Sequence, residues 1–170
     1  MGDFLLGAAV ALAATITGWA LSLATQIWRE RREARVAALF VYFELGALYA
    51  ETLSLQQFEA LTTEGPRRDA WDHYAPALSR IADDTTMERL AIVYSTAYTV
   101  VKNASIAAWA VTGSRSPVDA ISPWSLQLRH ARVSVEDAVR RVGKLARLTE
   151  TRVDADLTGL ASSYEDQEDQ

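Results

Sequence analysis

The sequence predicts an all-α protein in which an N-terminal transmembrane helix continues into an antiparallel cytoplasmic bundle of three to four helices. A run of 25 residues without a charged side chain, 4–28, opens the chain. Such a run exceeds the about 20 apolar residues that a helix needs to cross the hydrocarbon core. Beyond it, apolar residues recur at helical spacing and no strand-like alternation is found. We therefore divide the chain into an anchor (1–28), a helical bundle (29–152) and a disordered acidic tail (153–170).

Composition excludes several classes of protein. The chain of 170 residues has no cysteine, which rules out a disulfide scaffold, thiolate metal sites and a cysteine nucleophile. Its formal net charge of −5 argues against a dedicated nucleic-acid binder. Arginine strongly outnumbers lysine, and alanine is abundant, which is typical of GC-rich bacterial or phage genomes.

The apolar run is better explained as an uncleaved anchor than as a signal peptide or a soluble core helix. A signal peptide begins with basic residues and has an apolar run of about 7–15 residues, whereas this chain begins Met-Gly-Asp. Basic residues follow the run and only Asp3 precedes it, so the N-terminus is expected outside and the bundle in the cytoplasm, at the inner membrane. The predicted membrane-interface residues are Trp28, Arg29, Arg31, Arg32 and Arg35.

Small residues recur along the predicted span at spacings of three and four. Such a stripe lets two helices approach closely, which predicts a helix-packing face and a homo-oligomer. Its residues are Gly7, Ala11, Ala14 and Gly18. The alternative is that an alanine-rich anchor shows such a stripe by chance.

The first bundle helix is expected to continue out of the anchor, because no proline occurs before Pro66. Residues 36–55 could instead form a second span, but Glu44 and Glu51 would be costly in lipid. We expect Glu44 to be a bundle-edge carboxylate paired with an arginine, the alternative being a buried functional acid.

Three further helices are predicted over 67–82, 85–112 and 123–151. The second begins at a capping box of Thr85 and Glu88, and the third at Ser122 followed by Pro123. Asp69 and His73 have metal-ligand spacing but no third partner, so a solvated pair is favoured. The expected core residues are Phe40, Phe43, Leu48, Trp71, Leu78, Val93, Val100, Val135, Val139 and Val142.

Basic residues gather on the last predicted helix. They are Arg129, Arg132, Arg140, Arg141, Lys144 and Arg147. They form either a solvated helix face, a patch for anionic lipid headgroups or an acidic partner, or a nucleic-acid contact, which we consider unlikely from the net charge. The acid-rich segment after Asp154 has no evident apolar repeat and predicts disorder.

Motifs for phosphate loops, dinucleotides, zinc and nucleophile elbows are absent. His73 and His130 fall on different predicted helices without a nearby nucleophile. We therefore expect no catalysis, no cofactor and no metal.

The stretch 32–48 reads R-x-x-R-V-A-A-L-x-x-x-x-E-L-x-x-L and follows directly on a span. In this it resembles small bacterial and phage single-pass membrane proteins with a cytoplasmic helical domain. The resemblance implies a fold arrangement and not an activity. Some anchored helical proteins of phages and prophages exclude other phages, which is an analogy only. We expect a membrane-anchored interaction or scaffold protein with membrane lipids and an unknown protein as partners. The alternative is a toxin-like or phage-exclusion effector that oligomerises and perturbs the bilayer.

Overall fold

The computed structural model describes residues 2–57, 66–110 and 121–165, with side chains for all of these except 2–11, 109 and 163–165. The described residues form five α-helices and one 3-10 turn, which confirms the all-α prediction. The elements are α1 (Gly2–Gln56), α2 (Asp69–Leu78), α3 (Asp84–Ala110), η1 (Ser122–Trp124), α5 (Ser125–Leu145) and α6 (Glu150–Glu165).

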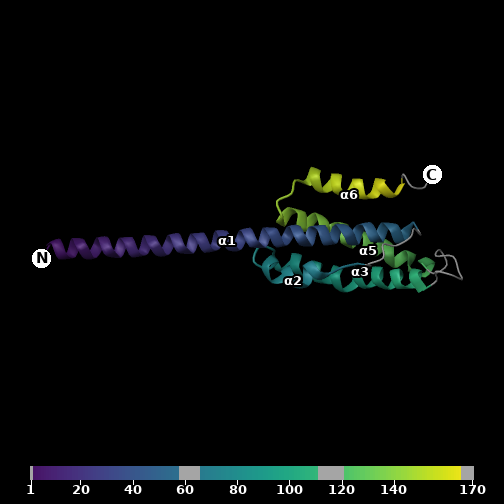
Figure 1. Ribbon diagram of the computed structural model, residues 1–170, viewed down its shortest axis with the longest axis horizontal. Helices are drawn as coiled ribbons and strands as arrows, with labels where there is room; N and C mark the ends of the chain where they lie inside the picture. The colour runs from purple at the N-terminus through teal and green to yellow at the C-terminus, as the bar shows by residue number, and fades with distance from the viewer. Residues whose placement is uncertain (1, 58–65, 111–120, 166–170) are drawn as a thin grey trace.

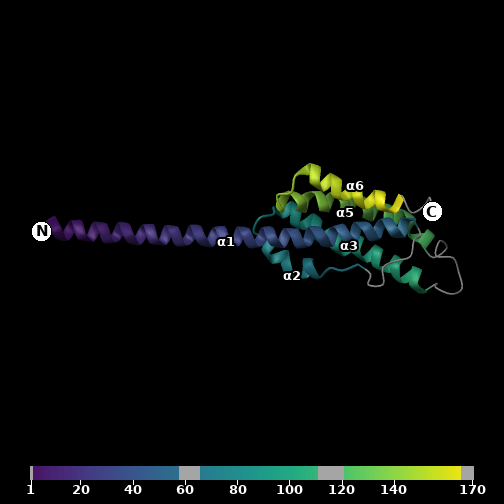
Figure 2. The same cartoon turned by 45° about the horizontal axis from the view of Figure 1, so that its top comes forward.

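Helix α1 is 55 residues long and unbroken, which corresponds to about 80 Å. Its first half projects alone from the molecule, and its second half lies among the other helices (Figures 1 and 2). The absence of proline permits this length. A hairpin of two spans is therefore wrong, because residues 36–55 extend α1 in the same direction.

The other helices pack along the second half of α1 and alternate in direction, antiparallel and then parallel to it. The N-terminus of α2 lies beside Glu44 and its Tyr74 stacks on Phe40, so α2 runs antiparallel to α1. Helix α3 returns parallel to α1, and α5 runs antiparallel again. Helix α6 doubles back along α5 and α1, as Figure 2 shows.

The core lies where α1, α3 and α5 meet. Six of the predicted core residues are fully buried: Leu48, Leu78, Val93, Val135, Val139 and Val142. Trp71 and Val100 are half-buried. The prediction that Phe40 and Phe43 are buried is wrong, since their side chains are 49% and 64% exposed. Residues 36–43 are apolar on every side, and α1 turns its small residues Ala37, Ala38 and Val41 inward to let the neighbouring helices approach.

The predicted disordered tail is wrong for residues 153–165, which belong to α6. Val153 and Leu157 are buried and Leu160 packs against the core. Their spacing of four and three places them on one helix face. Three apolar positions are therefore enough to fold an acid-rich segment onto α1 and α5. Residues 166–170 of the predicted tail lie outside the described residues.

The single helix predicted over 123–151 is also wrong, because the chain turns between α5 and α6. The amide of Leu148 donates to Gly143 O at 2.9 Å, and that of Arg147 donates to Lys144 O at 3.0 Å. This pair of bonds is a Schellman motif, with Arg147 in the left-handed region at φ 61°. Glycine usually occupies that position, so the sequence hides the turn.

The start of α3 differs slightly from the predicted capping box. Asp83 Oδ1 accepts a hydrogen bond from the amide of Thr86 at 2.6 Å. Asp83 is therefore the cap in place of Thr85. Hydrogen bonds from the Thr86 hydroxyl and from the Thr86 amide lower the pKa of Asp83. The predicted cap Ser122 lies inside the 3-10 turn that precedes α5.

Candidate membrane-facing and interaction surfaces

The projecting half of α1 is a helix whose apolar side chains are exposed. The described part Leu12–Gln56 is long and apolar enough to cross a membrane, and so is the core helix of some soluble proteins. The 18-residue stretch that is apolar enough is 56% buried, so it lies mainly in the half of α1 within the bundle. A membrane span and the core helix of a soluble protein differ in the exposure of their apolar side chains, because a soluble core helix is covered by its own chain. Between positions 12 and 28, large apolar side chains such as Trp19 and Leu21 are 68% and 69% exposed. Between positions 12 and 28, this half of the helix is therefore not covered by any described part of the chain.

The predicted interface residues lie where α1 enters the bundle. Trp28 is exposed, and the Arg32 guanidinium stands 5.6 Å from the centre of its ring. Arg29, Arg31 and Arg32 are exposed, whereas Arg35 is half-buried. Ala34 is the first fully buried residue of α1 from position 12 onward. It lies six residues after Trp28, or about 9 Å along the helix. The bundle thus begins within the arginine cluster, between Arg32 and Arg35.

The small-residue stripe lies entirely on the projecting half of α1. Ala14 and Gly18 are exposed, and a Cβ added at Gly18 would meet nothing within 4 Å. Gly7 and Ala11 occupy the same helix, and their side-chain surroundings lie outside the described residues. None of the described residues packs on this face at Ala14 and Gly18.

Glu44 joins three helices. Its carboxylate accepts the backbone amides of Ala70 at 2.7 Å and Trp71 at 3.1 Å, and the Tyr94 hydroxyl at 2.7 Å. The expected ion pair with an arginine is wrong, because the carboxylate is held by the first turn of α2. A carboxylate is favoured there by the unpaired amides and the helix dipole. Burial, followed by the bond to Glu44, raises the pKa of Tyr94.

Glu51 lies one heptad beyond Glu44 on the same helix. The Ser105 hydroxyl of α3 is 3.2 Å from its Oε1. Burial raises the pKa of Glu51, and the Ser105 hydrogen bond partly opposes this rise. Nothing in the sequence pattern distinguishes these two carboxylates, yet Glu44 is held by backbone amides and Glu51 is half-buried with a hydroxyl as its partner.

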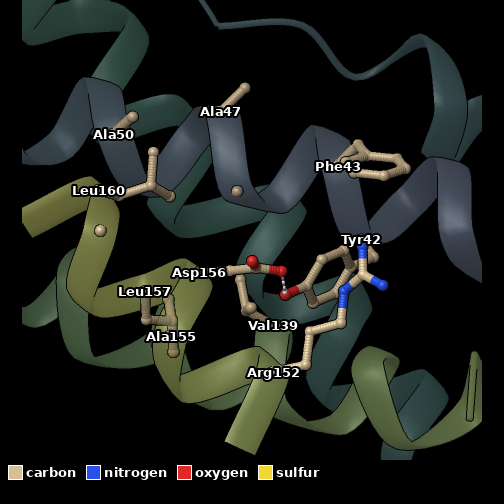
Figure 3. Close-up of a pocket in the computed structure, with 12 residues that line it drawn as sticks. Tyr42, Phe43, Ala47, Ala50, Val139, Arg152, Ala155, Asp156, Leu157 and Leu160 are labelled. Atoms are coloured by element: carbon tan, nitrogen blue, oxygen red, sulfur yellow. Dashed lines mark hydrogen bonds between the residues drawn. The ribbon is translucent and has the colours of Figure 1, made fainter. Parts of the chain in front are cut away.

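A groove of about 490 Å³ opens between α1, α5 and α6. Figure 3 shows Tyr42 pointing toward Asp156, with Arg152 beside them. The Tyr42 hydroxyl donates to Asp156 Oδ2 at 2.8 Å. Desolvation, then this bond, raises the pKa of Tyr42. Alanines and glycines widen the rest of the groove. The spacing of Val153, Leu157 and Leu160 was the signal that could have placed α6 here.

The predicted basic patch does not form one free cationic surface. Arg140 pairs with Asp154 and Glu136, Arg141 with Asp137, and Lys144 with Glu150. Arg132 stands 5.8 Å from the Tyr49 ring centre. With Arg129 it lines a hollow of about 600 Å³ toward the opposite end of α5.

Arg147 differs from the other basic residues of the predicted patch in its position, because it lies beyond the end of α5. It is exposed in the turn between α5 and α6. Figure 1 places this turn at the end of the bundle from which the projecting half of α1 emerges. Arg147 thus lies on the same side of the bundle as the arginines that follow the span.

Within the part of the chain that the structure describes, no group of three His, Asp or Glu side chains could hold a metal ion. Asp69 and His73 are both exposed, as expected of a solvated pair. His130 is exposed on α5, on a different helix from His73. The chemically distinctive groups are therefore the half-buried carboxylates Glu44 and Glu51 on α1 and the exposed apolar faces of that helix.

Comparison with protein-family models, with curated proteins and with solved structures gives no match for this chain.

Proposed function

We infer that the chain is a membrane-anchored interaction module that holds a helical bundle against the cytoplasmic face of a bacterial inner membrane. The observation that carries this proposal is the division of α1 into two halves of one unbroken helix. The first half is apolar and uncovered by its own chain, and the second half is central to the bundle.

Charge supports the orientation of this anchor. Four arginines follow the apolar run within seven residues, at 29, 31, 32 and 35, and positive flanks remain in the cytoplasm. Arg147 lies at the same end of the bundle. Anionic lipid headgroups attract such residues by about 1 kcal/mol each. We therefore propose that the N-terminus lies outside and that membrane lipid is the first partner of the protein.

The bundle supports a binding role more readily than a catalytic one. Its groove between α1, α5 and α6 is broad and largely apolar, and the polar groups Tyr42 and Asp156 satisfy each other. Confinement to a membrane raises the effective concentration of a tethered surface toward partners in the same membrane. We propose that the bundle binds a protein partner there.

Topology is tested with single cysteines, since the natural chain has none. A membrane-impermeant maleimide added to intact cells should label Asp3→Cys and leave Thr99→Cys unlabelled until the cells are opened. The protein should also stay in the membrane pellet after carbonate washing. Release by carbonate, or labelling of Thr99→Cys from outside, would contradict the anchor or its orientation.

The binding role is tested by chemical cross-linking in intact membranes. The full chain should capture a defined partner, whereas residues 29–170, expressed alongside, should lose it. Equal capture by both forms would show that the anchor is not needed for binding the partner. No capture by either form would oppose the interaction module itself.

A further inference from the structure

One face of α1 stays exposed after the helix has entered the bundle. We call this face the α1 ridge, and its residues are Val36, Phe40, Phe43 and Ala47. The three large side chains are 45%, 49% and 64% exposed. Phe40 stacks on Tyr74 at 5.1 Å between ring centres, and Phe43 stands at the edge of the groove beside α6. Large apolar side chains on successive turns of a solvated bundle mark an interaction surface.

The α1 ridge continues the line of the small-residue stripe. With 3.6 residues per turn, positions 7, 11, 14 and 18 fall within about 40° of Val36, as do Phe40, Phe43 and Ala47. Figures 1 and 2 show α1 as a straight helix from one half to the other. The same side of one helix is therefore uncovered both in the span and in the bundle.

A partner for this whole face must have an apolar helix in the membrane and a matching surface just outside it. A second copy of this chain meets both conditions. Membrane insertion orients every copy alike, so two α1 helices can lie side by side, in parallel and in register.

Flanking charges favour this arrangement. Arg32 lies about 40° to one side of the ridge line and Glu33 about 60° to the other. Both are exposed, and no ion pair to either is found among the described residues. A two-fold axis parallel to α1 brings Arg32 of one copy next to Glu33 of the other. The proposed anchorage puts Arg29, which is nearer the ridge line, beside lipid headgroups whose phosphates neutralise its charge.

We propose that the protein is a parallel homodimer, paired along the α1 ridge and the small-residue stripe and tied by reciprocal Arg32–Glu33 contacts. This proposal rests on the membrane anchorage proposed above. Close packing of small residues operates in the span, and burial of the exposed aromatic side chains operates in the bundle.

Single-cysteine cross-linking of the full chain in intact membranes tests the pairing. Gly18→Cys and Ala47→Cys should each give disulfide dimers when an oxidant is added. Matched controls are Ala20→Cys, which is exposed about 160° away on the same helix, and Thr99→Cys, which is exposed on α3. The two face positions should give several-fold more dimer than the controls.

Charge exchange tests the register. Arg32→Glu and Glu33→Arg should each lower the dimer yield of Ala47→Cys, and the double variant should restore it. The double variant keeps the net charge of the membrane boundary, so recovery reports the contact between copies.

Each outcome bears on a stated part of the proposal. Carbonate-resistant protein that gives no excess dimer at Gly18→Cys or Ala47→Cys overturns the dimer and leaves the anchor standing. Cross-links at these positions to a different protein also overturn it. Protein found in the soluble fraction overturns the anchor and, with it, this form of pairing.

Discussion

At the scale of single residues, Glu44 is the side chain on which most of the helix arrangement depends. It replaces a local cap for α2 with a contact from 26 residues away, since Arg68 before α2 makes no side-chain cap. The same carboxylate accepts the Tyr94 hydroxyl, so the register of three helices is fixed at one point.

Glu44→Ala should therefore lower the free energy of unfolding by about 2–3 kcal/mol, because two amides and a buried hydroxyl lose a charged acceptor. Tyr94→Phe should cost about 1 kcal/mol. The matched control Glu88→Ala, exposed on α3, should change stability by less than about 0.5 kcal/mol. Urea unfolding of the detergent-solubilised chain measures all three, and equal midpoints for Glu44→Ala and Glu88→Ala would contradict the role of Glu44.

Glu51 should make stability depend on pH. Its pKa in the folded protein is raised above the ordinary 4.5, so the folded state binds the proton more tightly than the unfolded state. Stability from this group is then greatest at low pH and falls as pH rises from about 4.5 through the raised pKa. Glu51→Gln should raise stability at neutral pH and flatten this dependence.

Unfolding midpoints measured across the acidic to neutral range test this sign. Ser105→Ala is the informative companion, because it removes the hydrogen bond that favours the charged form. It should extend the fall in stability to higher pH. Parallel pH profiles for the natural chain and Glu51→Gln would show that Glu51 does not cause the dependence.

At the scale of the elements, Gly143 determines how closely α6 and α1 approach α5. A Cβ added there would lie 2.7 Å from Val153 Cγ2 and 3.5 Å from Tyr42 Cε2. Gly143→Ala should destabilise the protein by about 1–3 kcal/mol, although alanine is the better helix former by about 1 kcal/mol. Adding Val153→Ala should recover part of the loss.

Gly159→Ala on α6 is the control, because nothing lies within 4 Å of its added Cβ. It should stabilise the chain by up to about 1 kcal/mol. Thermal unfolding followed by circular dichroism compares the variants. If both alanines stabilise equally, the contact between α5 and α6 is looser than the structure indicates.

The elements differ in how far the sequence alone predicts them. Helix α1 was predictable through its whole length, because a missing proline and a long apolar run are local signals. Helix α6 was missed because its apolar positions Val153, Leu157 and Leu160 are sparse among acids. The turn before it was missed because Arg147 takes a conformation that usually indicates glycine.

For the candidate sites too, the sequence predicts features that depend on neighbouring residues and misses those that depend on distant ones. The exposed arginines that follow Trp28 are visible in the sequence, because they lie directly beside an apolar run. Their role at a membrane interface stays a prediction. The partners of Glu44 and Tyr42 were not, because both bonds join segments far apart in the chain. A basic stretch on α5 was visible, but the acids that neutralise it lie partly on α6, which the sequence did not reveal as a helix.

At the scale of the whole molecule, α1 joins its projecting half to the bundle in one unbroken helix. The arginine segment between them is helical and exposed. A rotation of the span about its axis must therefore turn the bundle as well. This coupling makes the proposed dimer sensitive to the number of residues between its two faces. The small-residue stripe and the α1 ridge point the same way only while no residue is added to or removed from the segment 29–33.

Insertions between Arg31 and Arg32 test this coupling without touching the buried part of α1. Two added alanines rotate the span by about 200° relative to the bundle, whereas seven added alanines restore the phase within about 20°. Gly18→Cys and Ala47→Cys should both cross-link with seven alanines, and one of them should fail with two. The bundle should melt at the same temperature in both. If both positions cross-link in both insertions, the two faces pair independently, and the rigid coupling through α1 is wrong.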